Sequence, residues 1–242
     1  DLRGDRPFRC RGVSYAEDRN TEDGAACRHR LYLATHDRML WAIDALTGRA
    51  CANFGEQGSV ALYGEEGYQP GDVSNSSAPT VANGVVVVGS SVIDFARATT
   101  PRGTVKAFDG SSGEPLWQFD PLLGRPESGS ANVWAPMSVD PERGLIYLPT
   151  SAPSPDYYGV ARPGDDLYAN SIVALSLGSG ELVWHFQHVR HDLWDYDTPA
   201  QPILFEWRKN GEQIPALAQL TKQGFVFVLN RLTGESLWEI TE

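Results

Sequence analysis

The segment Ala107-Phe108-Asp109-Gly110-Ser111-Ser112-Gly113, with Trp117 four residues after its last glycine, has the form that decides the fold. An apolar strand ends in a polar residue, a tight turn follows in which glycine accepts a positive φ, and the chain returns as a strand near the tryptophan. The same form recurs at residues 42–48, 174–180 and 228–234. The last two copies continue into Trp184 and Trp238, whereas the first has Cys51 and Phe54 nearby.

The turn glycines of the four copies, residues 48, 113, 180 and 234, are spaced by 65, 67 and 54 residues. Apolar runs between the copies have the length and pattern of short strands, and no long amphipathic helix is evident. The predicted strands are Arg30–Ala34, Val85–Gly89, Leu145–Pro149 and Phe225–Leu229. Repeats of short strands at this spacing predict an all-β protein, a β-propeller of four-stranded blades.

Residues 1–242 are therefore expected to form one propeller domain of about four blades, with the repeated tryptophans packed between neighbouring blades. The chain begins abruptly and stops just after a turn-plus-tryptophan motif. We therefore expect it to be a stretch of a larger ring, a partial propeller domain.

The composition of the chain argues against two classes of function, nucleic-acid binding and membrane insertion by these residues. Charged residues make up 21% of the chain and the net charge is −11, with no cluster of Lys and Arg, which argues against a nucleic-acid partner. No apolar segment is long enough to span a membrane, so any membrane attachment is expected to come from a segment outside these residues.

The three cysteines form no Cys-x-x-Cys pair, which disfavours a zinc or thioredoxin-like site. Cys27 and Cys51 border two strands that would be neighbours, so they are either a disulfide or two buried free thiols. A disulfide would imply an oxidising compartment.

The densest polar and aromatic run is His188–Pro202, whose first ten residues hold three acids, two histidines and two aromatic residues. One interpretation is a site, and the other is an ordinary Asp- and Pro-rich loop between blades. A zinc site at His185, His188 and His191 is disfavoured, because on an extended chain the middle residue points away from the other two.

Three further clusters, Arg9–Tyr15, Asn132–Ser138 and Ser151–Gly159, complete a pattern with the His188–Pro202 run. In this order, and from about residue 8 to the end, the chain resembles the dehydrogenases that use pyrroloquinoline quinone (PQQ), most closely the membrane-associated glucose and quinate dehydrogenases. The most specific element is His191-Asp192-Leu193-Trp194-Asp195 through Pro199-Ala200-Gln201-Pro202, followed by Thr221-Lys222-Gln223-Gly224.

The resemblance implies an eight-bladed propeller with PQQ near its axis over Ca²⁺ or Mg²⁺. The roles it implies are a catalytic base and metal contact at Asp195, a cation on the quinone oxygens at Lys222, a stacking indole at Trp134, metal ligands at Asp94 and Ser154, and cofactor neighbours at Arg11 and Ser138. It further implies oxidation of a sugar, cyclic polyol or other alcohol, electron transfer to ubiquinone, and a periplasmic site tethered to the inner membrane.

Two departures bear on the substrate. Glucose dehydrogenases of this type often have a histidine shortly before the Cys-Arg-Gly motif, but Arg6–Arg9 contains none, and Phe95 stands where an asparagine is common. Quinate, shikimate or another polyol therefore remains an alternative to glucose. Two other classes are a non-catalytic scaffold propeller and a sugar- or peptide-binding propeller without the cofactor.

Overall fold

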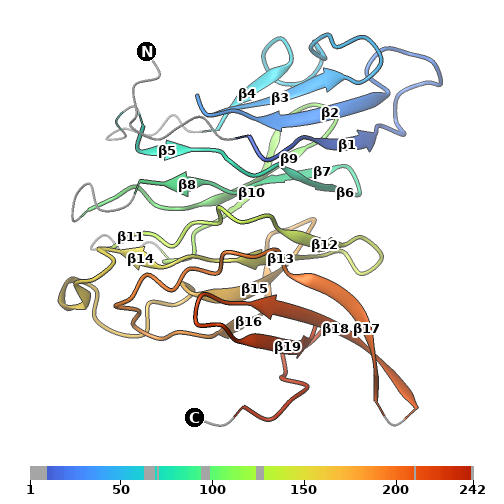
Figure 1. Ribbon diagram of the computed structural model, residues 1–242. Coiled ribbons are helices and arrows are strands. Elements are labelled where there is room, and N and C mark those ends of the chain that lie inside the picture. Colours follow the sequence, from blue (N-terminus) through green and yellow to red (C-terminus); the bar gives the residue numbers. More distant parts are fainter. Residues whose placement is uncertain are drawn as a thin grey trace.

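The computed structural model describes residues 10–62, 69, 71–93, 99–123, 128–209 and 211–240 of the chain. Four antiparallel sheets follow one another in chain order, from the N-terminal sheet at the top of Figure 1 to the C-terminal sheet at the bottom. Three of these sheets have four strands and the last has three. The prediction of an all-β fold with about four blades is confirmed.

The blades are named here by their order in the chain. The first contains β1 (Ser14–Glu17), β2 (His29–Ala34), β3 (Met39–Asp44) and β4 (Ser59–Ala61), and the second contains β6 (Thr80–Ala82), β7 (Val85–Val88), β9 (Val105–Asp109) and β10 (Pro115–Phe119). The third contains β12 (Ser138–Asp140), β13 (Leu145–Pro149), β15 (Ser171–Ser176) and β16 (Leu182–Gln187), and the fourth contains β17 (Ile203–Lys209), β18 (Glu212–Leu220) and β19 (Val226–Asn230).

Two short ribbons complete the fold, β5 (Val73–Ser74) with β8 (Ser91–Val92) and β11 (Gly129–Ser130) with β14 (Pro153–Ser154). A 3₁₀ turn at Gly159–Ala161 is the one helical element of the described residues, none of which form a helix long and apolar enough to cross a membrane. The predicted strand Leu145–Pro149 is β13, and the other three predicted strands differ from β2, β7 and β19 by at most one residue at either end.

The core lies between the blades. Strand β7 is buried on both faces: Val86 and Val88 pack against the first blade, whereas Val85 and Val87 pack against the third. Because both faces are covered, this strand is a continuous apolar run rather than an alternating one. A third cluster, which includes Tyr147 and Leu217, joins the third blade to the fourth.

Two of the four recurring turns are closed by their own acids. In the first turn, Asp44 Oδ1 accepts hydrogen bonds from the amides of Leu46 and Thr47, and in the second, Asp109 Oδ1 accepts from those of Ser111 and Ser112. Such local side-chain bonds favour a turn over a continued strand.

The aromatic residue of each of the first three blades covers the turn glycine of the next. A Cβ atom at Gly180 would lie 2.6 Å from Trp117, and one at Gly234 would lie 2.6 Å from Trp184. In the first blade, Phe54 takes the same place against Gly113. The predicted packing of Trp117 and Trp184 between blades is thus confirmed, whereas Trp238 is 56% exposed and lies edge-on to Trp207.

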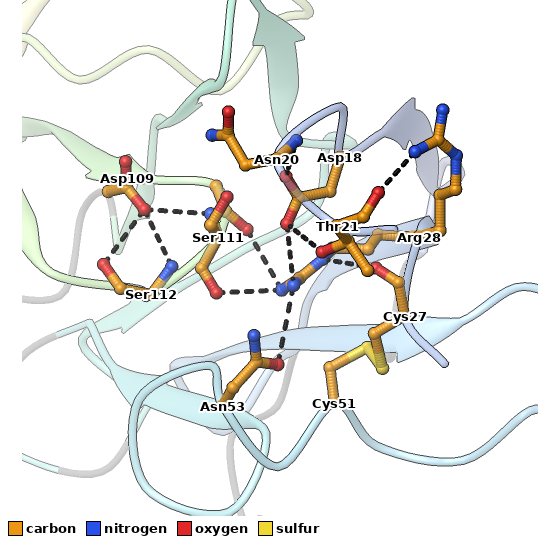
Figure 2. Close-up of polar contacts among 12 residues, drawn as sticks. Asp18, Asn20, Thr21, Cys27, Arg28, Cys51, Asn53, Asp109, Ser111 and Ser112 are labelled. Carbon is orange, nitrogen blue, oxygen red and sulfur yellow. Dashed lines mark hydrogen bonds and ion pairs between the residues drawn. A yellow bond between two sulfur atoms is a disulfide. The ribbon is translucent and has the colours of Figure 1, made fainter. Parts of the chain in front are cut away.

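Cys27 and Cys51 form a disulfide, so the alternative of two free thiols is not realised (Figure 2). Beside it, the fully buried Arg30 donates hydrogen bonds to the carbonyl oxygens of Cys27, Gly110 and Ser111 and pairs with Asp18 at 2.9 Å. These bonds join the first blade to the turn of the second.

Candidate active site

A cavity of about 340 Å³ opens where loops from all four blades converge. Four residues predicted for the site, Arg11, Trp134, Asp195 and Lys222, line it together. They come from chain positions up to 211 residues apart, so only the propeller fold brings them to one place. The volume is within the range of small-ligand pockets, about 300–1,000 Å³.

The loop at residues 188–202 is organised by Asp192, which is buried and accepts hydrogen bonds from the amides of Trp194 and Tyr196 and from Asn170. These bonds curl the chain around one carboxylate. Within the curl, Asp195 has φ +58°, a left-handed conformation that Asp tolerates better than most residues.

The charged wall of the cavity consists of Asp195, Asp197 and Lys222. Lys222 Nζ donates to the main-chain oxygen of Asp195 at 2.7 Å, to Asp195 Oδ2 at 3.2 Å and to Asp197 Oδ2 at 2.9 Å. The other oxygen of Asp197 accepts a hydrogen bond from the Ala152 amide at 2.9 Å. Asp197 therefore links Lys222 to the third blade.

The electrostatics of this wall favour a proton acceptor near neutral pH. Burial, followed by the negative charge of Asp197, raises the pKa of Asp195 to about 6, and Lys222 opposes the rise. Although burial disfavours the ammonium ion, the hydrogen bond to Asp197 and the charges of both acids raise the pKa of Lys222 above its ordinary value. Lys222 is therefore a cation at neutral pH, and Asp195 is a carboxylate that can take up a proton.

A second wall consists of Trp134 and Arg11. The Arg11 guanidinium lies 5.0 Å from the centre of the indole and donates to the Trp134 carbonyl oxygen at 3.0 Å. The backbone before Trp134 is closely packed, because a Cβ atom at Gly89 would lie 2.1 Å from Val133 O and one at Gly103 2.2 Å from Asn132 Cα. The indole thus stands on a rigid loop as an aromatic platform beside a cation.

Two predicted site residues, Ser138 and Ser154, do not line this cavity. Ser138 begins β12 and lines a separate cavity beside the edge strands of the blades, where its hydroxyl donates to Pro202 O at 2.5 Å. Ser138 therefore connects the third blade to the loop before the fourth blade. Ser154 is buried in β14, and its hydroxyl has no hydrogen-bond partner among the described residues. Asp94 lies outside the described residues.

A divalent metal ion needs several oxygen donors grouped around it. Within the part of the chain that the structure describes, no three His, Cys, Asp or Glu side chains are grouped to hold a metal ion. The carboxylates of Asp156, Asp195 and Asp197 all line the cavity, with Lys222 among them. Hard oxygen donors of this kind are those that Ca²⁺ and Mg²⁺ use.

Ten residues that line the cavity were not predicted as site residues, and His36, Asn75, Asp156 and Asp197 are four of them. Asp197 belongs to the predicted polar run and Asp156 to a predicted cluster, so their acidic character was a usable signal. His36 lies in the turn between β2 and β3, and Asn75 follows β5. Each is one polar residue in a short loop, a pattern that does not indicate a site.

Comparisons with known proteins agree with this geometry. The family model described as PQQ, glucose/ethanol/alcohol dehydrogenase β-propeller domain, matches residues 2–242. The chain is 35% identical to quinoprotein glucose dehydrogenase A of Acinetobacter calcoaceticus over 100% of this chain and 34% of that protein. It is 36% identical to the quinate/shikimate dehydrogenase (quinone) of Acinetobacter baylyi over 97% of this chain and 32% of that protein.

A solved structure of a quinohemoprotein alcohol dehydrogenase from Pseudomonas putida superposes with a TM-score of 0.74 at 30% identity, covering 86% of this chain and 32% of that one. The chain thus spans about one third of the length of the relatives it matches.

Proposed function

Because this chain belongs to the PQQ family of glucose/ethanol/alcohol dehydrogenase β-propeller domains, we propose that the protein oxidises the CH–OH group of a sugar, cyclic polyol or other alcohol with PQQ as the electron acceptor. The observation that carries the proposal is that Asp195, Lys222, Trp134 and Arg11 line one cavity. A quinone cofactor, when bound, supplies the two-electron chemistry, and the protein supplies orientation and charge.

Asp195 is the general base. Its carboxylate is placed to accept the proton of the substrate hydroxyl, and a bound cofactor would accept the hydride of the same carbon. A base is most effective when its pKa lies near the working pH, and a pKa of about 6 leaves Asp195 mostly ionised at pH 7. Its fixed conformation, with Asp192 holding the adjacent amides, keeps the carboxylate at one place in the cavity.

The remaining residues of the cavity suit a flat, anionic cofactor. Trp134 offers an aromatic face, and Lys222 and Arg11 supply two cations for carboxylate and quinone oxygens. Lys222 would stabilise negative charge on a quinone oxygen of a bound cofactor. Ser138 is proposed to act only through the loop that it contacts.

A divalent cation, Ca²⁺ or Mg²⁺, completes the proposed site. Asp94, Ser154 and Asp195 are the proposed protein donors, and all three offer the hard oxygen ligands that these ions prefer. The buried Ser154 hydroxyl has no hydrogen-bond partner in the part of the chain that the structure describes, and this supports a ligand role. The ion would serve as a Lewis acid beside the cofactor.

The substrate proposed is glucose or a related sugar, with quinate or shikimate as the alternative, since the chain is equally similar to relatives named for each. Ubiquinone is the proposed final acceptor. The disulfide between Cys27 and Cys51 supports a periplasmic location, because such bonds persist in oxidising compartments. Attachment to the inner membrane is proposed to use a segment outside this chain.

The test is dye reduction by the purified protein with PQQ and either Ca²⁺ or Mg²⁺, over a panel of glucose, quinate, glycerol and ethanol. We expect turnover that needs both PQQ and the metal and that falls at least about a thousandfold in Asp195→Asn, the order of effect expected for a positioned base. The best substrate identifies the subclass. A folded protein that neither binds PQQ nor turns over any of the four alcohols would refute the proposal.

A further inference from the structure

The ammonium group of Lys222 already has an acceptor for each of its three protons. Asp195 supplies two of them, its main-chain oxygen at 2.7 Å and Oδ2 at 3.2 Å, and Asp197 Oδ2 supplies the third at 2.9 Å. A lysine ammonium has three donors and no more. Lys222 can therefore contact a ligand oxygen only by giving up one of these bonds.

The bond to Asp195 Oδ2 is the one that yields most easily. It is the longest of the three, and N–H···O hydrogen bonds weaken beyond about 3.2 Å. Asp195 also keeps its main-chain oxygen on Lys222 when its carboxylate leaves. Asp197 is held more firmly, because its second oxygen accepts the Ala152 amide and its side chain is 15% exposed, against 23% for Asp195.

Asp197 is anchored to the same rigid part of the cavity as the indole. The Ala152 amide donates to Asp197, and the Ala152 carbonyl oxygen accepts from the Ala131 amide at 2.9 Å, three residues before Trp134. A charge fixed in this way can retain a lysine that is changing partners.

We propose that Asp197 is a positioning residue, which holds Lys222 in the cavity while Lys222 exchanges its bond to the Asp195 carboxylate for a bond to a ligand oxygen. This inference rests on the proposed function, and the ligand oxygen is then a carbonyl or carboxylate oxygen of the cofactor. The exchange frees Asp195 Oδ2 to accept the substrate hydroxyl proton. Binding of the cofactor and release of the base are thus one event.

The direction in which Asp197→Asn changes the affinity for PQQ distinguishes a positioning role of Asp197 from a purely electrostatic effect of its charge. Removing a negative charge from the cavity wall would by itself strengthen the binding of an anionic ligand. Without Asp197, however, Lys222 has only Asp195 as its ionic partner, and the ligand must break that pair. The exchange therefore predicts weaker binding of PQQ by Asp197→Asn, whereas net charge alone predicts tighter binding.

The experiment titrates PQQ into the apoprotein, with quenching of tryptophan fluorescence as the signal, and measures kcat and KM with the best substrate. Asp197→Asn keeps the size of the side chain, and Asp197→Glu keeps the charge. Asp23→Asn is the control for net charge. It removes the same charge from a 90% exposed acid that pairs with Arg28 and does not line the cavity. Melting of each apoprotein verifies that it is folded.

We expect Asp197→Asn to raise the Kd for PQQ and to lower kcat, each by about tenfold or more, with a smaller change in the KM for the alcohol, because a lost charge-assisted hydrogen bond is worth about that much. Asp197→Glu should recover part of both losses, and Asp23→Asn should match the wild type. Unchanged or tighter PQQ binding by Asp197→Asn, or no recovery in Asp197→Glu, would overturn the exchange while leaving the proposed function intact. A wild-type protein that binds no PQQ would overturn both.

Discussion

At the scale of single residues, Asp195 shows a conflict between stability and its proposed role as a base. Its carboxyl has a pKa of about 6 in the folded protein, against 3.8 ordinarily, because burial and Asp197 disfavour its charge. The folded state therefore binds the proton more tightly than the unfolded state does. Stability is lost as the pH rises through the window from about 4 to 6.

Asp195→Asn, which mimics the protonated acid, should therefore stabilise the apoprotein at pH 7.5 by about 1–3 kcal/mol, the upper value being the full shift and the lower one allowing for partial exposure. The gain should shrink at pH 4.5. Urea unfolding of both proteins at the two pH values measures it. Equal free energies of unfolding for the wild type and Asp195→Asn at pH 7.5 would show that the charge of Asp195 does not destabilise the folded protein.

Arg30 illustrates the opposite case, a buried charge whose partners are all in place. Its guanidinium is fully buried with Asp18 and three carbonyl oxygens around it. Arg30→Met should destabilise the protein by about 3–5 kcal/mol, because Asp18 is left as an unpaired acid at the seam between two blades. The control is Arg28→Met, whose loss should be smaller, about 1 kcal/mol, because its two acidic partners, Glu17 and Asp23, are 36% and 90% exposed. Similar midpoints of denaturation for the two variants would contradict the role given to Arg30.

At the scale of the structural element, the turn glycines determine how closely blades approach. Gly180 has φ +72°, and a Cβ there would meet the Trp117 ring at 2.6 Å, whereas Gly178 in the same turn has open space. Gly180→Ala should cost about 2 kcal/mol or more, from left-handed strain and displacement of the indole. Gly178→Ala should change stability by less than about 0.5 kcal/mol. If the two variants have the same midpoint of denaturation, the packing of the second blade on the third does not depend on the contact between Gly180 and Trp117.

The first blade replaces the tryptophan of the repeat with Phe54 and a disulfide. Cys27 and Cys51 are 24 residues apart and tie the start of β2 to the segment after β3. Closing a loop of this length stabilises by about 3 kcal/mol in the chain-entropy description. The double variant Cys27→Ser/Cys51→Ser should lose about that much, and dithiothreitol should lower the stability of the wild type but not of the double variant. If dithiothreitol lowers the stability of both proteins equally, its effect does not come from reduction of this disulfide.

At the scale of the whole molecule, the repeat was sufficient to predict the blades, because a strand, a turn that begins with a polar residue and an aromatic residue leave a regular pattern in the sequence. The motif residues Asp195, Lys222 and Trp134 were also predictable and do line one cavity. The different positions of the three acids could not be predicted. Asp192 organises the loop, Asp195 lines the cavity and Asp197 binds Lys222. Identical side chains in one run acquire different roles only through the contacts that folding gives them.

The arrangement of the blades predicts how the molecule opens. Among the described residues, the apolar clusters join each blade to its neighbours in the chain, so the local stability of residues 1–242 taken by themselves should follow the number of neighbouring blades. In the described residues, the second and third blades have one on each side. Amides of β7, β9, β13 and β15 should therefore exchange with deuterium most slowly, and those of β17–β19 faster.

Reduction of the disulfide should speed exchange in the first blade and leave the fourth unchanged. Uniform exchange across all four blades would show instead that the chain unfolds as one unit. The distinction matters for the proposed chemistry, because Arg11 precedes the first blade and Lys222 lies in the fourth. A cavity assembled from both ends of the chain exists only while the least stable blade is folded. A ligand that bridges Arg11 and Lys222 should then slow exchange most in the terminal blades, although it touches neither of their cores.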